Sequence, residues 1–265
     1  MKNQRESAPS GKSLRALDAL NLFAADVRDG LGPYLAVYLA SAGWAADRVG
    51  FVMAVMGFAT VAAQTPAGAV IDQVRGKRTV VMLSALAIGL AAVAMVLRST
   101  LLVITSAQVV IGVAAAVFPP AIAAISLGLV GRARFAARTG RNESFNHGGN
   151  VLAAVLAGAL GDLVSYEAIF YLVAAMSFAT IVSTCFLDPQ EIDHDQARGS
   201  DVSESDAKPR KVMPLSALFQ DRRILVFGVS VVLFHLANAA MLPLVGQKVT
   251  QGEREGAASL MSACI

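Results

Sequence analysis

The sequence predicts an all-α, polytopic membrane protein, and three observations support that fold class. Of its 265 residues, 55% are hydrophobic and only 15% are charged, which is too apolar for an ordinary soluble domain. The charges gather in short blocks between apolar runs of roughly 20 residues, the length of a helix that crosses a bilayer. These runs lack the alternation of barrel strands, and only helices or closed barrels satisfy backbone hydrogen bonds in lipid. Buried helices of a large soluble protein are the alternative, and such helices usually run shorter.

Seven apolar runs are predicted to span the membrane, and an eighth begins near Ala257 and reaches the last residue, Ile265. About nine residues of an eighth span are too few to cross, so we expect the front part of a longer protein, either a fragment or a truncated product. Prolines fall inside the first and fourth spans, where neighbouring helices and local distortion accommodate them. The predicted spans are 17–40, 49–70, 79–97, 101–130, 145–163, 168–187 and 223–245.

Lysine and arginine are unevenly distributed over the segments that connect these spans. With a cytoplasmic N-terminus, about 17 of the 22 basic residues fall on the cytoplasmic side and 4 on the other. Connecting segments rich in Lys and Arg remain in the cytoplasm. We therefore expect a multi-pass protein of a bacterial plasma (inner) membrane with its N-terminus in the cytoplasm. This sidedness explains the net charge of +3, which does not indicate a nucleic-acid partner.

A long polar segment separates the sixth predicted span from the seventh. It is rich in Asp, Glu, Ser and Arg and contains three prolines, a composition typical of a flexible linker. Six spans, a linker and further spans are the arrangement of a membrane protein built from two helical bundles. We expect a cytoplasmic N-terminus at 1–16, an N-terminal six-helix bundle at 17–187, a cytoplasmic linker at 188–222 and the start of a C-terminal bundle at 223–265.

The turn after the second predicted span carries a sequence motif. From Gly68 to Arg78 it reads GAVIDQVRGKR, which resembles the signature between the second and third helices of the major facilitator superfamily. There a Gly is followed four residues later by Asp, here Asp72, and then by a basic turn with a glycine, here Gly76. The resemblance implies the N-terminal portion of a twelve-span secondary transporter that moves a small-molecule solute by alternating access. It also implies that this motif latches the cytoplasmic side shut against a helix of the second bundle.

Physical arguments support a conformational role for the motif. Gly68 has no side chain, so another helix can approach closely there. Asp72 can meet the positive N-terminal end of a neighbouring helix. Arg75, Lys77 and Arg78 can bridge to carboxylates or to anionic lipid. The alternative is that these basic residues only anchor the turn on the cytoplasmic side.

Charged groups within predicted spans are costly in lipid, which makes them candidates for the solute or proton pathway. In the first span, Asp18, Asn21, Arg28 and Asp29 fall on one helical face, with Asp26 beside them. Arg28 can hold an anionic group of the solute, with Asp29 or Asp26 as its resting partner or as a proton carrier. A structural ion pair between helices is the alternative.

A second polar face opens the fifth predicted span, where Glu143, Asn146, His147 and Asn150 recur at i, i+3, i+4 and i+7. Histidine is the side chain type suited to proton exchange near neutral pH, and Glu143 lies one turn from His147, so this pair suits proton coupling. Hydrogen bonding and capping between helices is the alternative for the whole face.

Three further polar residues are weaker pathway candidates. His235 and Asn238 lie one turn apart in the seventh span, either near a cavity between the bundles or as packing residues. Gln108 precedes Gly112 by four residues, where the family often carries an arginine, so no arginine-based proton step is implied. A hydrogen bond between helices is the alternative role for Gln108.

No arrangement of residues suggests catalysis. We find no phosphate loop, no zinc spacing and no nucleophile with an ordered base, so we expect neither enzymatic activity nor a cofactor nor a metal. The expected partners are a small solute, the lipid bilayer, protons as coupling ion, and the missing C-terminal bundle of the full-length protein. A transporter-like membrane sensor and a non-functional truncated transporter are the alternatives.

Overall fold

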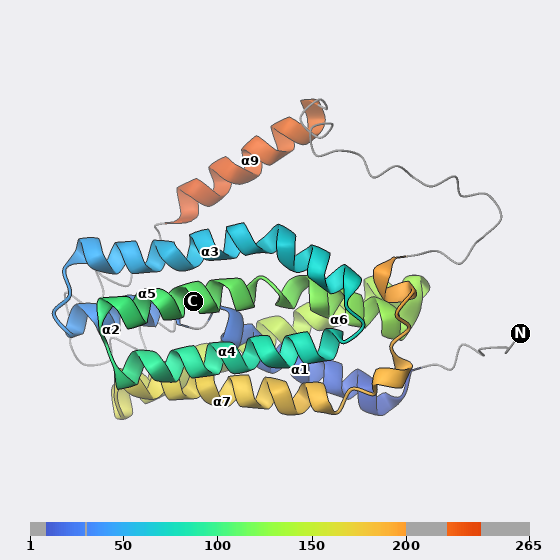
Figure 1. The fold of residues 1–265 in the computed structure, drawn as a ribbon, viewed down its shortest axis with the longest axis horizontal. Coiled ribbons are helices and arrows are strands. Elements are labelled where there is room, and N and C mark those ends of the chain that lie inside the picture. The colour runs from blue at the N-terminus through green and yellow to red at the C-terminus, as the bar shows by residue number, and fades with distance from the viewer. Residues whose placement is uncertain (1–8, 30, 200–221, 240–265) are drawn as a thin grey trace, which may run out of the picture.

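The computed structural model describes residues 9–29, 31–199 and 222–239, and the regular structure in these ranges is helical. Helices α1 to α7 lie side by side in an elongated bundle, and α9 is drawn apart from it (Figure 1). Within the described residues, four stretches are long and apolar enough to cross a membrane, namely Ala46–Gln73, Lys77–Leu97, Leu101–Leu163 and Tyr166–Cys185. The chain is therefore an all-α, polytopic membrane protein, as predicted.

The first predicted span consists of two helices instead of one. Helix α1 comprises Gly11–Asp29, and helix α2 comprises Gly32–Ser41. Pro33 lies in the first turn of α2, where a helix tolerates the missing amide hydrogen. The helix also begins earlier than the predicted span, so part of the segment that we expected to be an N-terminal extension belongs to α1.

The second and third predicted spans each correspond to one helix. Helix α3, Ala46–Gln73, and helix α4, Lys77–Leu97, are joined by a short turn. Small residues set how closely α3 meets its neighbour α5. A Cβ on Gly112 of α5 would lie 2.5 Å from the carbonyl oxygen of Met56 and 2.9 Å from the Cβ of Ala59, both on α3, so only glycine fits at this contact.

The fourth predicted span breaks just before its two prolines. Helix α5 is Leu101–Ala115, and α6, Phe118–Leu163, has Pro119 and Pro120 in its first turn. Helix α6 then kinks at Gly131, where φ is 70° and ψ is 170°, a conformation available essentially to glycine alone. Beyond the kink the chain is helical again, so the segment that we expected to connect the fourth and fifth spans extends the fifth.

Helix α7, Tyr166–Cys185, is followed by two short 3-10 turns, η1 at Pro189–Glu191 and η2 at Gln196–Arg198. We call the end of the bundle where α1 begins and α7 ends the linker end. Residues 188–199 pack against this end, as the orange segment beside α6 shows (Figure 1). Residues 200–221, which make up most of the predicted linker, lie outside the described residues.

The prediction of a flexible linker is wrong for residues 188–199. Leu187, Ile192 and Ala197 are buried, and the amide of Asp193 donates to the carbonyl oxygen of Gly128 at 3.0 Å. A Cβ on Gly128 would lie 2.8 Å from the oxygen of Asp193, so this glycine admits the segment against α6. Apolar anchors in an otherwise polar stretch therefore order the start of the linker.

Helix α9, Arg222–Ala239, coincides with the first part of the seventh predicted span, 223–245. Its residues 222–237 are all exposed. The eighth predicted span lies outside the described residues.

Candidate functional site: a buried ion-pair network near the linker end

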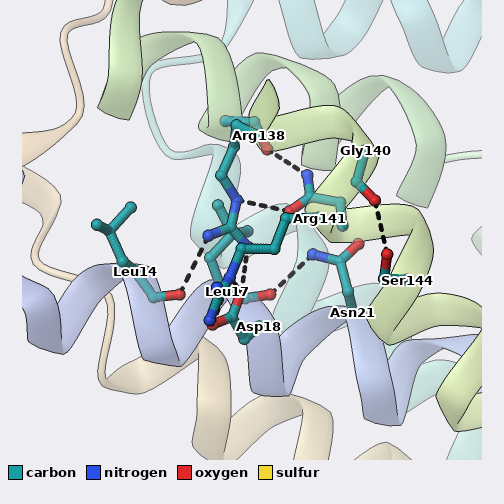
Figure 2. A network of polar contacts seen from close by, with 10 residues as sticks. Leu14, Leu17, Asp18, Asn21, Arg138, Gly140, Arg141 and Ser144 are labelled. Atoms are coloured by element: carbon teal, nitrogen blue, oxygen red, sulfur yellow. Dashed lines mark hydrogen bonds and ion pairs between the residues drawn. The ribbon is translucent and has the colours of Figure 1, made fainter. Parts of the chain in front are cut away.

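A buried carboxylate joins α1 to α6 near the linker end (Figure 2). Asp18 on α1 is 5% exposed. Its Oδ1 accepts a hydrogen bond from Nη2 of Arg138 at 2.5 Å, and its Oδ2 accepts one from Nη2 of Arg141 at 2.7 Å. Nε of Arg141 also donates to both oxygens, at 3.0 and 3.1 Å. Charge-assisted bonds of this kind are shorter and stronger than neutral ones, so Asp18 holds α6 to α1 through two arginines.

Arg138 extends the network through the kink in α6. Its Nε donates to Oδ1 of Asn142 at 2.7 Å, and Nδ2 of Asn142 donates to Oγ of Ser126 at 2.8 Å. Its third nitrogen, Nη1, lies 3.5 Å from the carbonyl oxygen of Leu14. Ser126 precedes the kink at Gly131 and Asn142 follows it, so one buried chain of hydrogen bonds fixes both arms of α6 relative to α1.

The two arginines differ in exposure, and this difference separates their roles. The side chain of Arg138 is 4% exposed and that of Arg141 is 59% exposed. A buried charge that loses its partner costs several kcal/mol, whereas an exposed pair contributes little. Arg141 also packs over the ring of Phe145 at 5.3 Å, a cation–π contact. Arg138 is therefore the structural partner of Asp18, and Arg141 brings a second positive charge to the surface of the network.

The predicted polar face of the first span is buried where the structure describes it. Asn21 and Asp26 are each 5% exposed, and Nδ2 of Asn21 donates to the carbonyl oxygen of Leu17 at 2.7 Å, within its own helix. The face is turned into the bundle, away from lipid. The side chains of Arg28 and Asp29 lie outside the described residues.

The predicted polar face of the fifth span lies beside the network without taking part in it. Glu143 and His147 are exposed, and Asn146 and Asn150 are half-buried. Their neighbour Asn142 is the residue that points into the bundle. The side chains of these four residues therefore remain at least partly accessible on α6 in the described structure.

The other pathway candidates are scattered. Gln108 is 2% exposed, and its Nε2 donates to the carbonyl oxygen of Val52 at 3.4 Å. Its Oε1 is buried without a hydrogen-bond partner among the described residues. His235 is exposed on α9, and the side chain of Asn238 lies outside the described residues.

Part of the glycine-containing motif is open. Gly68 is half-buried, and a Cβ added there meets nothing within 4 Å in the described part of the chain. Asp72, Arg75 and Gly76 are exposed. This side of the turn can therefore receive another helix or lipid.

The other basic residues of the motif require a correction, because they do not bridge to carboxylates in the described structure. Lys77 is 1% exposed, and its Nζ donates to the carbonyl oxygen of Val74 at 3.0 Å. Arg78 donates to the carbonyl oxygens of Thr184 and Cys185, at 3.1 and 3.0 Å. The last carbonyls of a helix lack partners within it and attract cations. Both residues thus stabilise helix ends.

Asp18 lies on the predicted polar face of the first span, but the sequence pattern did not identify its partners. Arg138 and Arg141 contributed only to the predicted sidedness. One signal was available, because Arg138, Asn142 and Gly149 recur on one face of a helix, and all three are buried in α6.

Apolar helices of membrane-spanning length, packed around a few paired charges, define an integral membrane protein with polar groups turned inward. The family model of the Major Facilitator Superfamily matches residues 18–265. The chain belongs to the major facilitator superfamily, as its glycine-containing motif predicted.

Two relatives come from Mycobacterium tuberculosis, one from strain CDC 1551 / Oshkosh and one from strain ATCC 25618 / H37Rv. Each is described as an uncharacterized MFS-type transporter and is 46% identical to this chain over 252 residues. The match covers 95% of this chain and 60% of each relative. The chain therefore spans about 60% of the length of the curated relatives that it matches.

Proposed function

We propose that the chain forms the first part of a secondary transporter, which moves a small solute across a bacterial plasma membrane by alternating access. Family membership and the transporter names of the two mycobacterial relatives support this proposal. The observation that carries it is the inward polar face of α1, where Asp18, Asn21 and Asp26 are buried. Charges inside a membrane bundle are costly, and they mark solute or ion pathways by default.

In this proposal the Asp18–Arg138 pair keeps the first bundle rigid. Alternating access in two-bundle transporters is largely a rocking of one bundle against the other around a central site. A bundle that rocks as one body needs its helices fixed to one another. The pair ties α1 to both arms of α6, so we assign it this structural role and not that of solute binding.

We further propose that transport is coupled to protons through the carboxylates of α1. Asp26 lies about two turns further along α1 than Asp18, away from the linker end, and it is 5% exposed. Glu143 and His147 stand exposed on α6 and provide titratable groups at the neighbouring face. Asp26 would carry the proton, and these two would exchange it with water.

The second bundle is the proposed partner of the open side of the motif. Gly68 has free space at its Cβ position within the described residues, and Asp72 is exposed beside it. A helix end from the second bundle can approach the glycine and place its positive N-terminus at the carboxylate. We propose that this contact closes the side of the protein on which the N-terminus lies, which the basic residues assign to the cytoplasm.

The test is a transport assay with the full-length protein in liposomes that contain a pH-sensitive dye. A panel of amino acids, sugars and nucleosides is added in turn, with and without an imposed pH gradient. For a solute that moves, Asp26→Asn should abolish gradient-driven accumulation and retain exchange of solute. The matched control is Asp47→Asn, because Asp47 is an exposed carboxylate in the first turn of α3.

Two outcomes would contradict the proposal at different levels. If the Asp26→Asn variant still accumulated solute in response to the pH gradient, as the wild type does, Asp26 would not be the proton carrier. Saturable solute binding without any flux in the wild type would instead favour a transporter-like sensor. Measuring binding and flux on the same preparation separates the two.

A further inference from the structure

A groove of about 530 Å³ lies between the first turns of α1 and the last turn of α7, at the linker end. We propose that this groove binds one anionic phospholipid, with its phosphate at Lys12 and Arg15 and one acyl chain against α7. This inference rests on the location of the chain in a membrane and on the proposed cytoplasmic side of the linker end, and not on the solute or the coupling of transport. Besides the two basic residues, the groove is lined mainly by small and apolar side chains, including Ala16, Ala19, Val182 and Phe186.

The apolar part of the groove can receive an acyl chain. Ala16 and Ala19 on α1 are small, which leaves the space open. Val182 on α7 is 38% exposed, Phe186 directly after this helix is 54% exposed, and Phe178, one turn before Val182, is 68% exposed. Spacing by four residues places these three along one face of α7 and its C-terminal end. The groove therefore continues as an apolar stripe along a helix of membrane-spanning length.

The basic part of the groove lies at the level of the lipid headgroups. Phe186 directly follows Cys185, where the spanning helix α7 ends. Nζ of Lys12 lies 5.6 Å from the centre of the Phe186 ring, and Arg15 is on the same face of α1, three residues further. Both basic residues are exposed, so a phosphate can reach them while its acyl chain follows α7.

Among the described residues, the carboxylate of Glu191 affects this basic part. Glu191 lies close enough that the charge of Lys12 contributes to lowering the Glu191 pKa. Its Oε2, however, accepts hydrogen bonds from the amide and the hydroxyl of Ser10, at 3.1 and 3.0 Å. Because Glu191 is already hydrogen-bonded to Ser10, Lys12 and Arg15 remain the cationic side chains that line the described groove.

A phospholipid uses both parts of the groove, whereas a free phosphate uses only the basic part. Anionic lipids are enriched in the cytoplasmic leaflet, and a Lys or Arg near its surface strengthens association by about fivefold, the equivalent of about 1 kcal/mol. With the N-terminus on the proposed cytoplasmic side, the linker end lies in that leaflet. The geometry therefore favours a lipid with a negative headgroup.

Native mass spectrometry of the purified chain with equimolar phosphatidylglycerol and phosphatidylcholine of identical acyl chains tests the proposal. The wild type should retain phosphatidylglycerol preferentially. Arg15→Gln should lower this preference by about fivefold, and Lys12→Gln with Arg15→Gln should abolish it. Arg134→Gln is the matched control, since Arg134 is also an exposed arginine at the linker end and its loss changes the net charge equally. Circular dichroism of each variant confirms that the helices are retained.

Two further measurements separate the groove from general surface charge. Ala19→Leu fills the apolar part and leaves both cations in place, so it should reduce phosphatidylglycerol retention by several-fold. Inorganic phosphate in excess should not displace the lipid. The proposal is overturned if Arg134→Gln weakens retention as much as Arg15→Gln, if Ala19→Leu binds as the wild type does, or if inorganic phosphate displaces the lipid.

Discussion

Replacing Gly149 by alanine tests the contact between α1 and α6 on which the ion-pair network depends. A Cβ on Gly149 would overlap the carbonyl oxygen of Leu22 and lie 2.9 Å from the Cβ of Ala25, both on α1. The adjacent Gly148 provides a matched control. Its Cβ would meet only Cδ1 of Leu22, at 3.8 Å, which is an ordinary van der Waals distance. The two substitutions are chemically identical and differ only in how closely α1 approaches the substituted residue.

The change in the free energy of unfolding of each variant follows from two opposing effects. Alanine in place of a helical glycine stabilises the folded protein by about 1 kcal/mol at either position, because alanine has the higher helix propensity. Overpacking costs typically 1–3 kcal/mol, and the upper part of this range applies to Gly149 because a backbone carbonyl cannot rotate away. We therefore expect Gly148→Ala to stabilise by up to about 1 kcal/mol and Gly149→Ala to destabilise by about 2 kcal/mol. For a chain of this size, the difference corresponds to roughly 6–12 °C in melting temperature.

Thermal unfolding of the two variants in the same detergent, followed by circular dichroism, measures this difference directly. Detergent and irreversible unfolding affect both melting temperatures alike, so the difference between the two variants is less sensitive to them than either melting temperature alone. If the two variants melted within about 2 °C of each other, α1 and α6 would not approach as closely as described. The geometry of the Asp18 network would then be wrong as well.

Three further predictions concern charges at the linker end. Asp18→Asn leaves the guanidinium of Arg138 buried without its counter-charge and should lower the free energy of unfolding by about 3–5 kcal/mol, which thermal melts will measure. Arg141→Gln, at a side chain that is 59% exposed, should cost at most about 1 kcal/mol in the same assay, and a larger loss than for Asp18→Asn would reverse the roles assigned to the two arginines. Desolvation raises the pKa of Glu191, but hydrogen bonds from Ser13 and Ser10 and the charge of Lys12 outweigh it and lower the pKa below its ordinary value of 4.5. The contact of residues 188–199 with α1 should therefore be complete above that value and weaken as the pH falls through the lowered pKa. Hydrogen exchange of this segment will detect the change, and Glu191→Gln should remove its pH dependence.

The apolar runs predicted the spanning helices well where each helix carries one uninterrupted hydrophobic stretch. The predicted spans 49–70, 79–97 and 168–187 coincide closely with α3, α4 and α7. Length and hydropathy are sufficient there because lipid tolerates only helices in a chain of this composition. The same criteria merged α1 with α2, because length and hydropathy do not reveal that a new helix begins at Gly32 and Pro33.

The site was harder to predict than the spans because it depends on contacts between distant segments. Asp18 was recognisable from its place on the polar face of α1. Its partners Arg138 and Arg141 stood in a segment that resembled a polar connection, and a helical pattern among them has meaning only once that segment is known to be helical. The chain changes direction at Gly131 and is helical on both sides of it, and the presence of a glycine does not by itself reveal a positive φ.

The uneven distribution of lysine and arginine predicts the side of the membrane on which a segment lies, but not whether a given basic residue is accessible there. Lys77 contributes to the bias, yet its ammonium group is buried against a backbone carbonyl. Arg198 donates to the carbonyl oxygen of Gln73 at 2.9 Å and so helps to fasten residues 188–199 to the end of α3. Lys12 and Arg15, by contrast, are exposed beside an apolar groove. Because unpaired helix-end carbonyls attract cations as lipid phosphates do, only the packing around each basic residue distinguishes a structural donor from a surface that meets lipid.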